Sequence, residues 1–405
     1  MNKAPWRWPL YAQTLAAMAL GVAVGLLGGA PAGALGGIAR AIVSLIKAFA
    51  TPLLFFAILD AILQAQVHGR RIAALLAACL FDGACACAIA VAINRVFEPG
   101  AHFAVAASAF KALPEPPSWS ATLAAMVPES LLAPFVTNAL PGVIGLAILL
   151  GLVARSLEAK PESADAAALA AVRPITSLGL AASLRVLSWI TRLTPLAVFG
   201  AVAKAVGEHG FALLPGLGAY LAACLGGMLL HVALVYQGWA LAAGIALKRF
   251  WRETREAVVY SLGVNSSLAT LPFTLKALDR LGVSPGSARL SACIGTNLNN
   301  DGILLYEVAA ALFLAQAHGL HLGVLRQLGV AAASVLATVG VAGVPEAGFI
   351  ALTLVLTTAG LPAESLPLLL TVDWMVGRAR SGVNVLGDIS VGIAIDKLAG
   401  RGSKS

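Results

Sequence analysis

The side chains with the clearest chemical capacity lie in the apolar stretch of residues 371–396, which carries Asp373, Arg378, Arg380, Asn384 and Asp388. An arginine guanidinium suits two-point capture of a carboxylate, and carboxylate and amide oxygens are hard ligands for a small cation. Inserting the four charged side chains among these five at mid-bilayer would cost roughly 10 to 14 kcal/mol, whereas the Val, Leu and Ile residues of the stretch return only about 3 to 5 kcal/mol. This segment therefore cannot face lipid.

On a period of 3.6 residues the polar positions of this segment fall on one face of a helix. The stripe consists of Asp373, Gly377, Arg380, Ser381, Asn384 and Asp388. Ionisable residues inside a membrane usually mark a path for a substrate or an ion, so we expect the stripe to line a site enclosed by protein. The alternative is a buried ion-pair network that only locks helices together.

A second polar interruption is the sequence GTNLNNDG at residues 295–302, within an otherwise apolar span. Gly, Asn and Asp are poor helix formers, so we expect an unwound turn there. Unwound backbone at membrane depth is tolerated where it lines a cavity, and its carbonyl oxygens suit a small cation. The alternative is a polar kink whose groups are satisfied by neighbouring helices.

Two segments are too short to cross the membrane twice and favour re-entrant helical hairpins. Residues 261–278 have two apolar arms around a Ser-rich tip, and residues 336–356 turn at the sequence GVAGVPEAG, residues 340–348. Each hairpin is followed by a span with a polar interruption. This order, occurring twice, is typical of an inverted repeat with its binding site near the bilayer midplane.

The composition is that of a multi-pass membrane protein, with 59% hydrophobic residues, 11% charged residues and a mean hydropathy of +0.89. We predict an all-α protein with about eight transmembrane helices and two re-entrant hairpins. The net charge of +8 does not indicate nucleic-acid binding, because Lys and Arg gather at alternate ends of the spans. Such clusters mark the cytoplasmic side, so both termini are expected inside the cell.

Four stretches of the sequence carry a family resemblance. They are SSLATLPFTL, NNDGILLYE, GVPEAGFIALTLVLTTAGLP and VDWMVGRARSGVNVLGD, and they resemble, in order and spacing, the signature stretches of the glutamate transporter and dicarboxylate/amino acid:cation symporter family. Two stretches of the middle third, MVPESLLAPF and RLTPLAVFGAVAKAV, also resemble family segments. The similarity therefore covers nearly the whole chain.

The resemblance implies a homotrimer in the bacterial inner membrane that works as an elevator. Residues 8–66 (spans 1 and 2) and 118–206 (spans 4 and 5) would form the scaffold. Residues 70–98 (span 3) and 212–398 (span 6 to span 8 with both hairpins) would form the transport domain. The implied activity is secondary active symport, in which Na+, and in some members H+, drives uptake of a small substrate.

The resemblance also assigns roles to single residues. Those expected around the substrate are Arg380, which would bind its carboxylate, Asn384, Ser266, Ser267, Gly343, Pro345, Gly377 and Ser381. Those expected around sodium are Asp388, Asn384, Asn299, Asp301 and Asp82, with backbone oxygens near Gly295 and from Thr338 to Gly340. Glu307 matches the residue that is linked to proton coupling in the eukaryotic branch.

Two departures from the family pattern bear on the substrate and the coupling ions. Members that transport amino acids carry an aspartate where this chain has Gly377. Without that aspartate, a substrate ammonium group would lose a charge-assisted bond, which would weaken binding by about 2 to 5 kcal/mol. We therefore favour a four-carbon dicarboxylate such as succinate, fumarate or malate, with an acidic amino acid (glutamate or aspartate) as the alternative. Asp82 replaces a usual hydroxyl residue and could bind sodium or hold a proton, and Glu307 is the better candidate for a proton carrier.

Other classes of protein fit less well. An intramembrane hydrolase using Ser266 or Ser267 would need a positioned base, but no histidine falls within the hairpin segments, HExxH does not occur, and neither serine lies in a GxSxG sequence. We therefore do not expect an enzyme. An ion channel is the second rival, and the resemblance implies that an anion leak can accompany transport. His231, alone in the sixth span, is interpreted as a satisfied core histidine.

Overall fold

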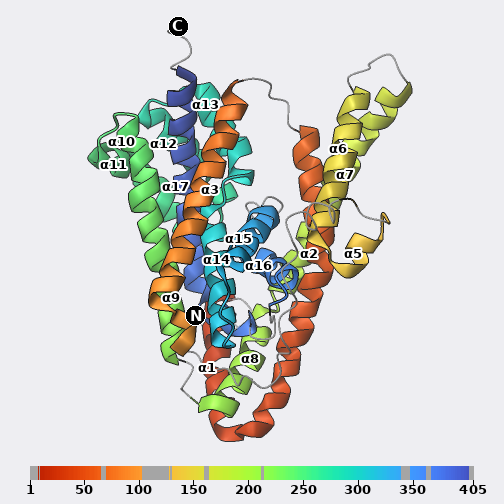
Figure 1. Ribbon diagram of the computed structural model, residues 1–405, viewed down its shortest axis with the longest axis vertical. Coiled ribbons are helices and arrows are strands. Elements are labelled where there is room, and N and C mark those ends of the chain that lie inside the picture. Colours follow the sequence, from red (N-terminus) through yellow and green to blue (C-terminus); the bar gives the residue numbers. More distant parts are fainter. Residues whose placement is uncertain are drawn as a thin grey trace.

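The computed structural model describes residues 8, 10–64, 70–102, 127, 130–158, 164–210, 214–338, 347–361 and 366–400. Every regular element in these ranges is helical, which confirms the predicted all-α class. The molecule is elongated, with its helices gathered into two packed groups that contact each other at one end and near the middle of the molecule (Figure 1).

The first group forms the lower and right-hand part of Figure 1. Its main helices are α1 (Leu10–Gly28), α2 (Gly36–Gln64), α6 (Leu140–Glu158), α7 (Ala164–Thr191) and α8 (Thr194–His209), with the short elements η2 (Ala30–Leu35) and α5 (Ala133–Thr137). Helix α2 packs against α6, α7 and α8, and α1 lies along α8. A Cβ atom at Gly21 or Gly25 would lie 2.8 Å from a carbonyl oxygen of α8, so glycine permits this close helix pair.

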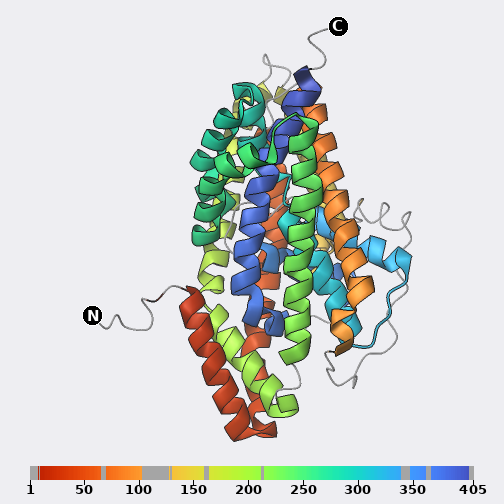
Figure 2. The same ribbon diagram turned by 90° about the vertical axis from the view of Figure 1, so that its left-hand side faces the viewer.

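The second group surrounds the carboxy-terminal helix α17 (Leu366–Gly400), which runs through most of its length (Figure 2). Its other elements are α3 (Arg70–Phe97), η3 (Pro99–His102), α9 (Leu214–His231), the π-helical turn η5 (Val232–Tyr236), α10 (Gln237–Ala242), α11 (Leu247–Val264), α12 (Ser267–Leu281), α14 (Asp301–Ala317), α15 (Val324–Thr338) and α16 (Ala347–Thr358). Helix α17 packs against α3, α9, α11, α12 and α14.

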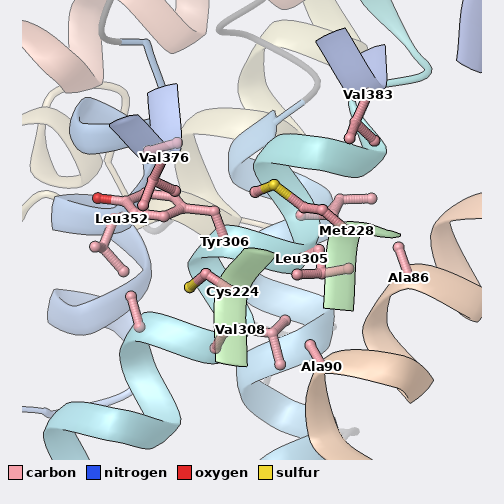
Figure 3. Packing of buried hydrophobic residues seen from close by; sticks show 14 of the residues in the cluster. Ala86, Ala90, Cys224, Met228, Leu305, Tyr306, Val308, Leu352, Val376 and Val383 are labelled. Carbon is pink, nitrogen blue, oxygen red and sulfur yellow. The ribbon is translucent and has the colours of Figure 1, made fainter. Parts of the chain in front are cut away.

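Small side chains bring the central helices of this group close together. Ala86 and Ala90 of α3 lie beside Leu305 of α14, and Met228 of α9 lies on the same cluster (Figure 3). All four side chains are buried. Close packing of this kind fixes the relative positions of the helices that carry the polar residues.

The first hairpin is formed by α11 and α12, as predicted from residues 261–278. Asn265 ends α11 in the left-handed conformation with φ of 54°, which asparagine tolerates better than most residues. Ser266 then caps α12 by accepting a 3.2 Å hydrogen bond from the Ala269 N–H group. This two-residue turn reverses the chain between the two helices.

Helices α15 and α16 pack together as the two arms of the second predicted hairpin. Most of its predicted tip, residues 340–348, lies outside the described residues, which resume at Ala347. Gly340, Gly343 and Pro345, which we had placed at the site, are therefore not described.

The predicted unwound turn at residues 295–302 is confirmed. After α13 (Pro285–Arg289), the chain passes through a π-helical turn, η6 (Leu290–Ile294), and a 3-10 turn, η7 (Gly295–Asn297), before α14 begins at Asp301. The carbonyl oxygen of Gly295 accepts hydrogen bonds from the backbone N–H groups of Leu298 and Asn299, both at 2.7 Å. This oxygen is therefore engaged within its own turn.

Two helical stretches among the described residues, Arg71–Phe97 and Pro215–Ala242, are long and apolar enough to cross a membrane. A pair bent by 45°, Val172–Ile190 with Thr194–Glu208, makes a third if it counts as one span. Helix α17 is longer than either but carries too many charges to resemble a lipid-facing span. Its predicted polar stripe is buried in protein from Asp373 to Asp388, as expected. The predicted number of eight spans stays a prediction.

Candidate substrate and cation site

Arg380 occupies the middle of α17 and is only 4% exposed. Its Nη2 atom lies 3.3 Å from Oδ2 of Asp373, two turns earlier on the same helix. The guanidinium carbon lies 4.2 Å from the centre of the Tyr306 ring of α14, within the range of a cation–π contact. Its Nη1 atom is buried without a hydrogen-bond partner among the described residues. The guanidinium is thus held on one side and retains unused donors on the other.

Two glycines allow the guanidinium nitrogens of Arg380 to pack closely against the backbone. A Cβ atom on Gly348, at the start of α16, would lie 2.2 Å from Nη1 of Arg380. A Cβ atom on Gly377 would lie 3.1 Å from Nη2. A larger residue at position 348 would displace the arginine, whereas a side chain at position 377 would require a smaller adjustment. Gly377, predicted near the substrate, is therefore directly beside Arg380.

The tip of the first hairpin meets α17 next to these glycines. Ser381 donates a 2.9 Å hydrogen bond from its hydroxyl to Oδ1 of Asn265. Ser267, the first residue of α12, is buried, and Ser266 serves as the helix cap. The structure therefore brings the predicted residues Ser266 and Ser267 to the same region as Gly377 and Ser381.

Asn384 connects α17 to the unwound turn by two hydrogen bonds. Its Oδ1 accepts a 2.9 Å hydrogen bond from the Gly302 N–H group, and its Nδ2 donates to Oδ1 of Asn300 at 3.3 Å. Asn300 in turn lies 3.5 Å from the carbonyl oxygen of Thr338 at the end of α15. Asn384 thus connects the Arg380 side of the site with the candidate cation side.

Three predicted cation ligands lie buried around the unwound turn and the lower part of the stripe. Asp301 is fully buried, and its Oδ2 atom accepts a 2.8 Å hydrogen bond from the Tyr236 hydroxyl and lies 3.3 Å from Nε2 of His231. Its Oδ1 atom, both polar side-chain atoms of Asn299 and Oδ1 of Asp388 have no hydrogen-bond partner among the described residues. Buried polar atoms are almost always paired, so these oxygens are suited to a ligand.

The donor set fits a small, hard cation such as Na+. It consists of carboxylate and amide oxygens. Within the described ranges no group of three or more His, Cys, Asp and Glu side chains is placed to hold a metal ion, so a cation here would also need an amide or backbone oxygen. Gly387 of α17 permits the close approach, since a Cβ there would lie 2.5 Å from Nδ2 of Asn299 and 2.7 Å from the Tyr236 hydroxyl.

Asp82 and Glu307 are two further buried carboxyl groups. Asp82, on α3, accepts a 2.8 Å hydrogen bond at Oδ1 from the indole N–H of Trp239, and its Oδ2 has no partner among the described residues. Glu307, on α14, is fully buried near Ser334 of α15 and Arg380. Asp82 therefore contacts α10, and Glu307 lies within electrostatic range of Arg380.

The sequence interpretation missed four residues that contact the predicted ones: His231, Tyr236, Trp239 and Asn265. His231 is fully buried with Nε2 3.3 Å from Oδ2 of Asp301, which agrees with its interpretation as a satisfied core histidine, although the partner was not predicted. His231 and Tyr236 are five residues apart, a spacing that an α-helix places on different sides and a π-helical turn on the same side. Polar side chains at this spacing within an apolar span were the available signal.

Comparisons with known proteins identify the family of this chain. The model of the sodium:dicarboxylate symporter family matches residues 10–398. A C4-dicarboxylate transport protein of Anaeromyxobacter sp. (strain K) is 28% identical over 409 residues, covering 97% of this chain and 90% of the relative. Excitatory amino acid transporter 3 of Mus musculus is 33% identical over 224 residues, covering 54% of this chain and 42% of the relative. An excitatory amino acid transporter of Caenorhabditis elegans is 42% identical over 140 residues, covering 34% and 28%.

Proposed function

Because the chain belongs to the sodium:dicarboxylate symporter family, we propose that it couples inward movement of Na+ to uptake of a four-carbon dicarboxylate such as succinate, fumarate or malate. It is a transporter and not an enzyme, as are the relatives that it matches. The observation that supports a dicarboxylate substrate is the buried Arg380. Its Nη1 has no partner among the described residues, and its Nη2 lies next to Gly377.

The surroundings of Arg380 favour a substrate that presents oxygen atoms. The guanidinium offers only donors, and a carboxylate can accept two of them at once. Gly377 supplies no carboxylate for an ammonium group, and the nearby Asp373 already pairs with Arg380. The C4-dicarboxylate transport protein, which matches along nearly the whole chain, supports this choice.

An acidic amino acid is the alternative substrate. The excitatory amino acid transporters support it, although their similarity covers about half of this chain or less. Under this alternative another acidic group, such as Asp373, would have to leave Arg380 and pair with the substrate ammonium. That exchange would break an existing buried ion pair, which is costly.

We assign the coupling ion to the unwound turn. Asp388, Asp301 and Asn299 would hold Na+ through their buried oxygens, and Asp82 would face the same region from α3. The bound ion would supply the positive charge that offsets these buried carboxylates. Glu307, beside Arg380, would carry a proton where one accompanies transport.

The proposal includes the larger assembly. The first packed group would be the scaffold of a homotrimer in the bacterial inner membrane, and the second group would be the moving transport domain, with both termini cytoplasmic. The separation of the described helices into two groups supports this division. An anion conductance alongside transport is compatible with the same arrangement.

Uptake by proteoliposomes separates the two candidate substrates. Labelled succinate uptake would be measured under an inward Na+ gradient, with unlabelled fumarate, malate, aspartate or glutamate as competitor. We expect the dicarboxylates to compete at concentrations at least about tenfold lower than aspartate, since the missing charged bond exceeds 1.4 kcal/mol. Tighter binding of aspartate or glutamate would instead select the amino acid alternative.

A further inference from the structure

We infer that Asn265, at the tip of the α11–α12 hairpin, determines substrate specificity by donating its carboxamide N–H groups to an oxygen of the substrate. This inference rests on the proposed function, because it names a residue that distinguishes a dicarboxylate from an amino acid at the same site. Asn265 was not among the residues predicted from the sequence.

The position of Asn265 relative to α17 carries the argument. A Cβ atom at Gly377 would lie 3.5 Å from both Nδ2 and Oδ1 of Asn265 and 3.1 Å from Nη2 of Arg380. The amide of Asn265 and Nη2 of Arg380 therefore both pack against Gly377, which brings them together because it has no side chain. Nη2 belongs to the Arg380 fork that we assign to the substrate.

The orientation of the amide is fixed by its neighbour. The Ser381 hydroxyl donates to Oδ1 of Asn265 at 2.9 Å, which assigns the carbonyl end of the amide to Ser381. The Nδ2 end, with two N–H donors, is not used by this bond and lies against Gly377, 3.5 Å from its Cβ position. Asn265 is half-buried, so a ligand can reach this nitrogen.

The N–H donors of Arg380 and Asn265 favour a substrate group that accepts hydrogen bonds. Arg380 contributes N–H groups and a positive charge, and Asn265 contributes neutral N–H groups. A carboxylate or hydroxyl oxygen of a dicarboxylate accepts such hydrogen bonds, whereas an ammonium group has no acceptor to offer and is repelled by the guanidinium. The carboxylate of Asp373, 3.3 Å from Nη2 of Arg380, is already paired with it.

A purely structural role for Asn265 is the competing explanation. Asparagine suits the left-handed backbone at φ of 54°, and its bond to Ser381 ties the hairpin tip to α17. Asn265→Asp separates the two roles, because aspartate has the same shape, tolerates the same backbone and retains an acceptor for Ser381. It replaces only the N–H donors with a negatively charged oxygen.

The chain offers a closely matched control. Asn138 also has a left-handed backbone, with φ of 52°, and its Oδ1 likewise accepts a hydrogen bond from a hydroxyl, that of Thr51, at 2.6 Å. It lies at the end of α5 in the other helix group. Asn138→Asp therefore makes the same chemical change in the same kind of turn away from Arg380.

The test compares the apparent affinities for succinate and aspartate in proteoliposomes containing the full-length wild-type protein, Asn265→Asp or Asn138→Asp. We expect Asn265→Asp to weaken succinate binding at least about tenfold and to shift the succinate-to-aspartate preference toward aspartate by at least the same factor. Asn138→Asp should keep the wild-type preference. An Asn265→Asp protein with the wild-type preference would overturn the inference.

Asn265→Gly covers the case in which the aspartate variant is inactive. Glycine accepts the left-handed turn and removes the amide, so succinate affinity should fall several-fold while aspartate affinity changes less. The inference would be overturned if Asn265→Gly bound succinate with the wild-type affinity and aspartate with the wild-type affinity. Failure of the proposed function is distinguishable, because the wild-type protein itself would then show no preference for succinate.

Discussion

Arg380 combines a buried charge with an incomplete set of partners. Asp373 engages one nitrogen of the guanidinium at 3.3 Å, and the Tyr306 ring covers its face. A substrate carboxylate that binds Nη1 would complete the hydrogen bonding without removing either contact. The arginine is therefore both positioned by the protein and open to a ligand.

Substituting Arg380 should remove substrate binding. Arg380→Ala deletes charge-assisted hydrogen bonds worth about 1.5 to 3 kcal/mol each, so the affinity for succinate should fall at least about 100-fold. Arg380→Lys retains the charge without the fork and should fall between alanine and wild type. Isothermal titration with succinate at saturating Na+ measures both. An unchanged affinity in Arg380→Ala would place the carboxylate site elsewhere.

Gly377→Asp should change the selectivity of the transporter. The new carboxylate would start from a Cβ position 3.1 Å from Nη2 of Arg380 and could pair with a substrate ammonium. We expect aspartate to compete with succinate uptake at least about tenfold better than in the wild type. Gly377→Asn, of the same size but uncharged, is the control and should not gain aspartate affinity. If both variants behave alike, bulk and not charge explains the effect.

Substituting Glu307 should change the pH dependence of uptake, whereas substituting Asp82 should change its Na+ dependence. Glu307 is fully buried beside Arg380, so Glu307→Gln should flatten the dependence of succinate uptake on external pH. Asp82→Asn makes the same exchange on α3 and should instead change the Na+ concentration needed for half-maximal uptake. Uptake measured against pH and against Na+ in both variants decides this. Retention of the wild-type pH profile by Glu307→Gln would refute the proton role.

The sequence predicted the α17 stripe well because all its residues lie on one helix, where the period alone sets the face. It could not predict the partners that come from distant elements. Asn265 reaches Ser381 across 116 residues, and Trp239 reaches Asp82 across 157. Such contacts depend on how the hairpin and the π-helical turn pack, which periodicity within one segment does not encode.

At the scale of elements, irregular helical turns position the candidate cation ligands. The π-helical turn η5 sets Tyr236 on the side of His231, and η6 with η7 leads the chain into the turn that carries Asn299 and Asp301. Asp388 of α17 completes this region. Because these elements meet the substrate side through Asn384, cation and substrate binding should be coupled.

Asp388→Asn tests that coupling. Removing the charge should weaken Na+ binding and, by thermodynamic linkage, weaken succinate binding at a fixed subsaturating Na+ concentration. Raising Na+ should restore part of the succinate affinity. Asp279→Asn, an exposed position on α12, is the control and should leave both unchanged. Wild-type Na+ dependence in Asp388→Asn would show that the cation site does not include this carboxylate.

The extent of the first hairpin could be predicted only in part. The sequence indicated residues 261–278, whereas α11 begins at Leu247. The first turns of α11 are rich in charged residues, which hydropathy assigns to a loop. The structure gives some of these charges partners, including Glu256 with Lys276 and Arg280 of α12. Pairing across the two arms therefore extends the hairpin beyond its apolar tip.

At the scale of the whole molecule, the two helix groups are the parts that would move relative to each other during transport. The described residues assigned to substrate and cation come from the second group, so they can move together without breaking the site. The first group contributes none of these residues among those described. This arrangement is what rigid movement of one group against the other would require.

The most direct test of cation-coupled dicarboxylate transport is accumulation of succinate against its own gradient. Proteoliposomes containing the purified protein would start with equal labelled succinate inside and outside, with Na+ only outside. We predict that internal succinate rises above the external concentration and returns to it when a sodium ionophore removes the Na+ gradient. Internal succinate that stays equal to external succinate, with or without the gradient, would contradict the account.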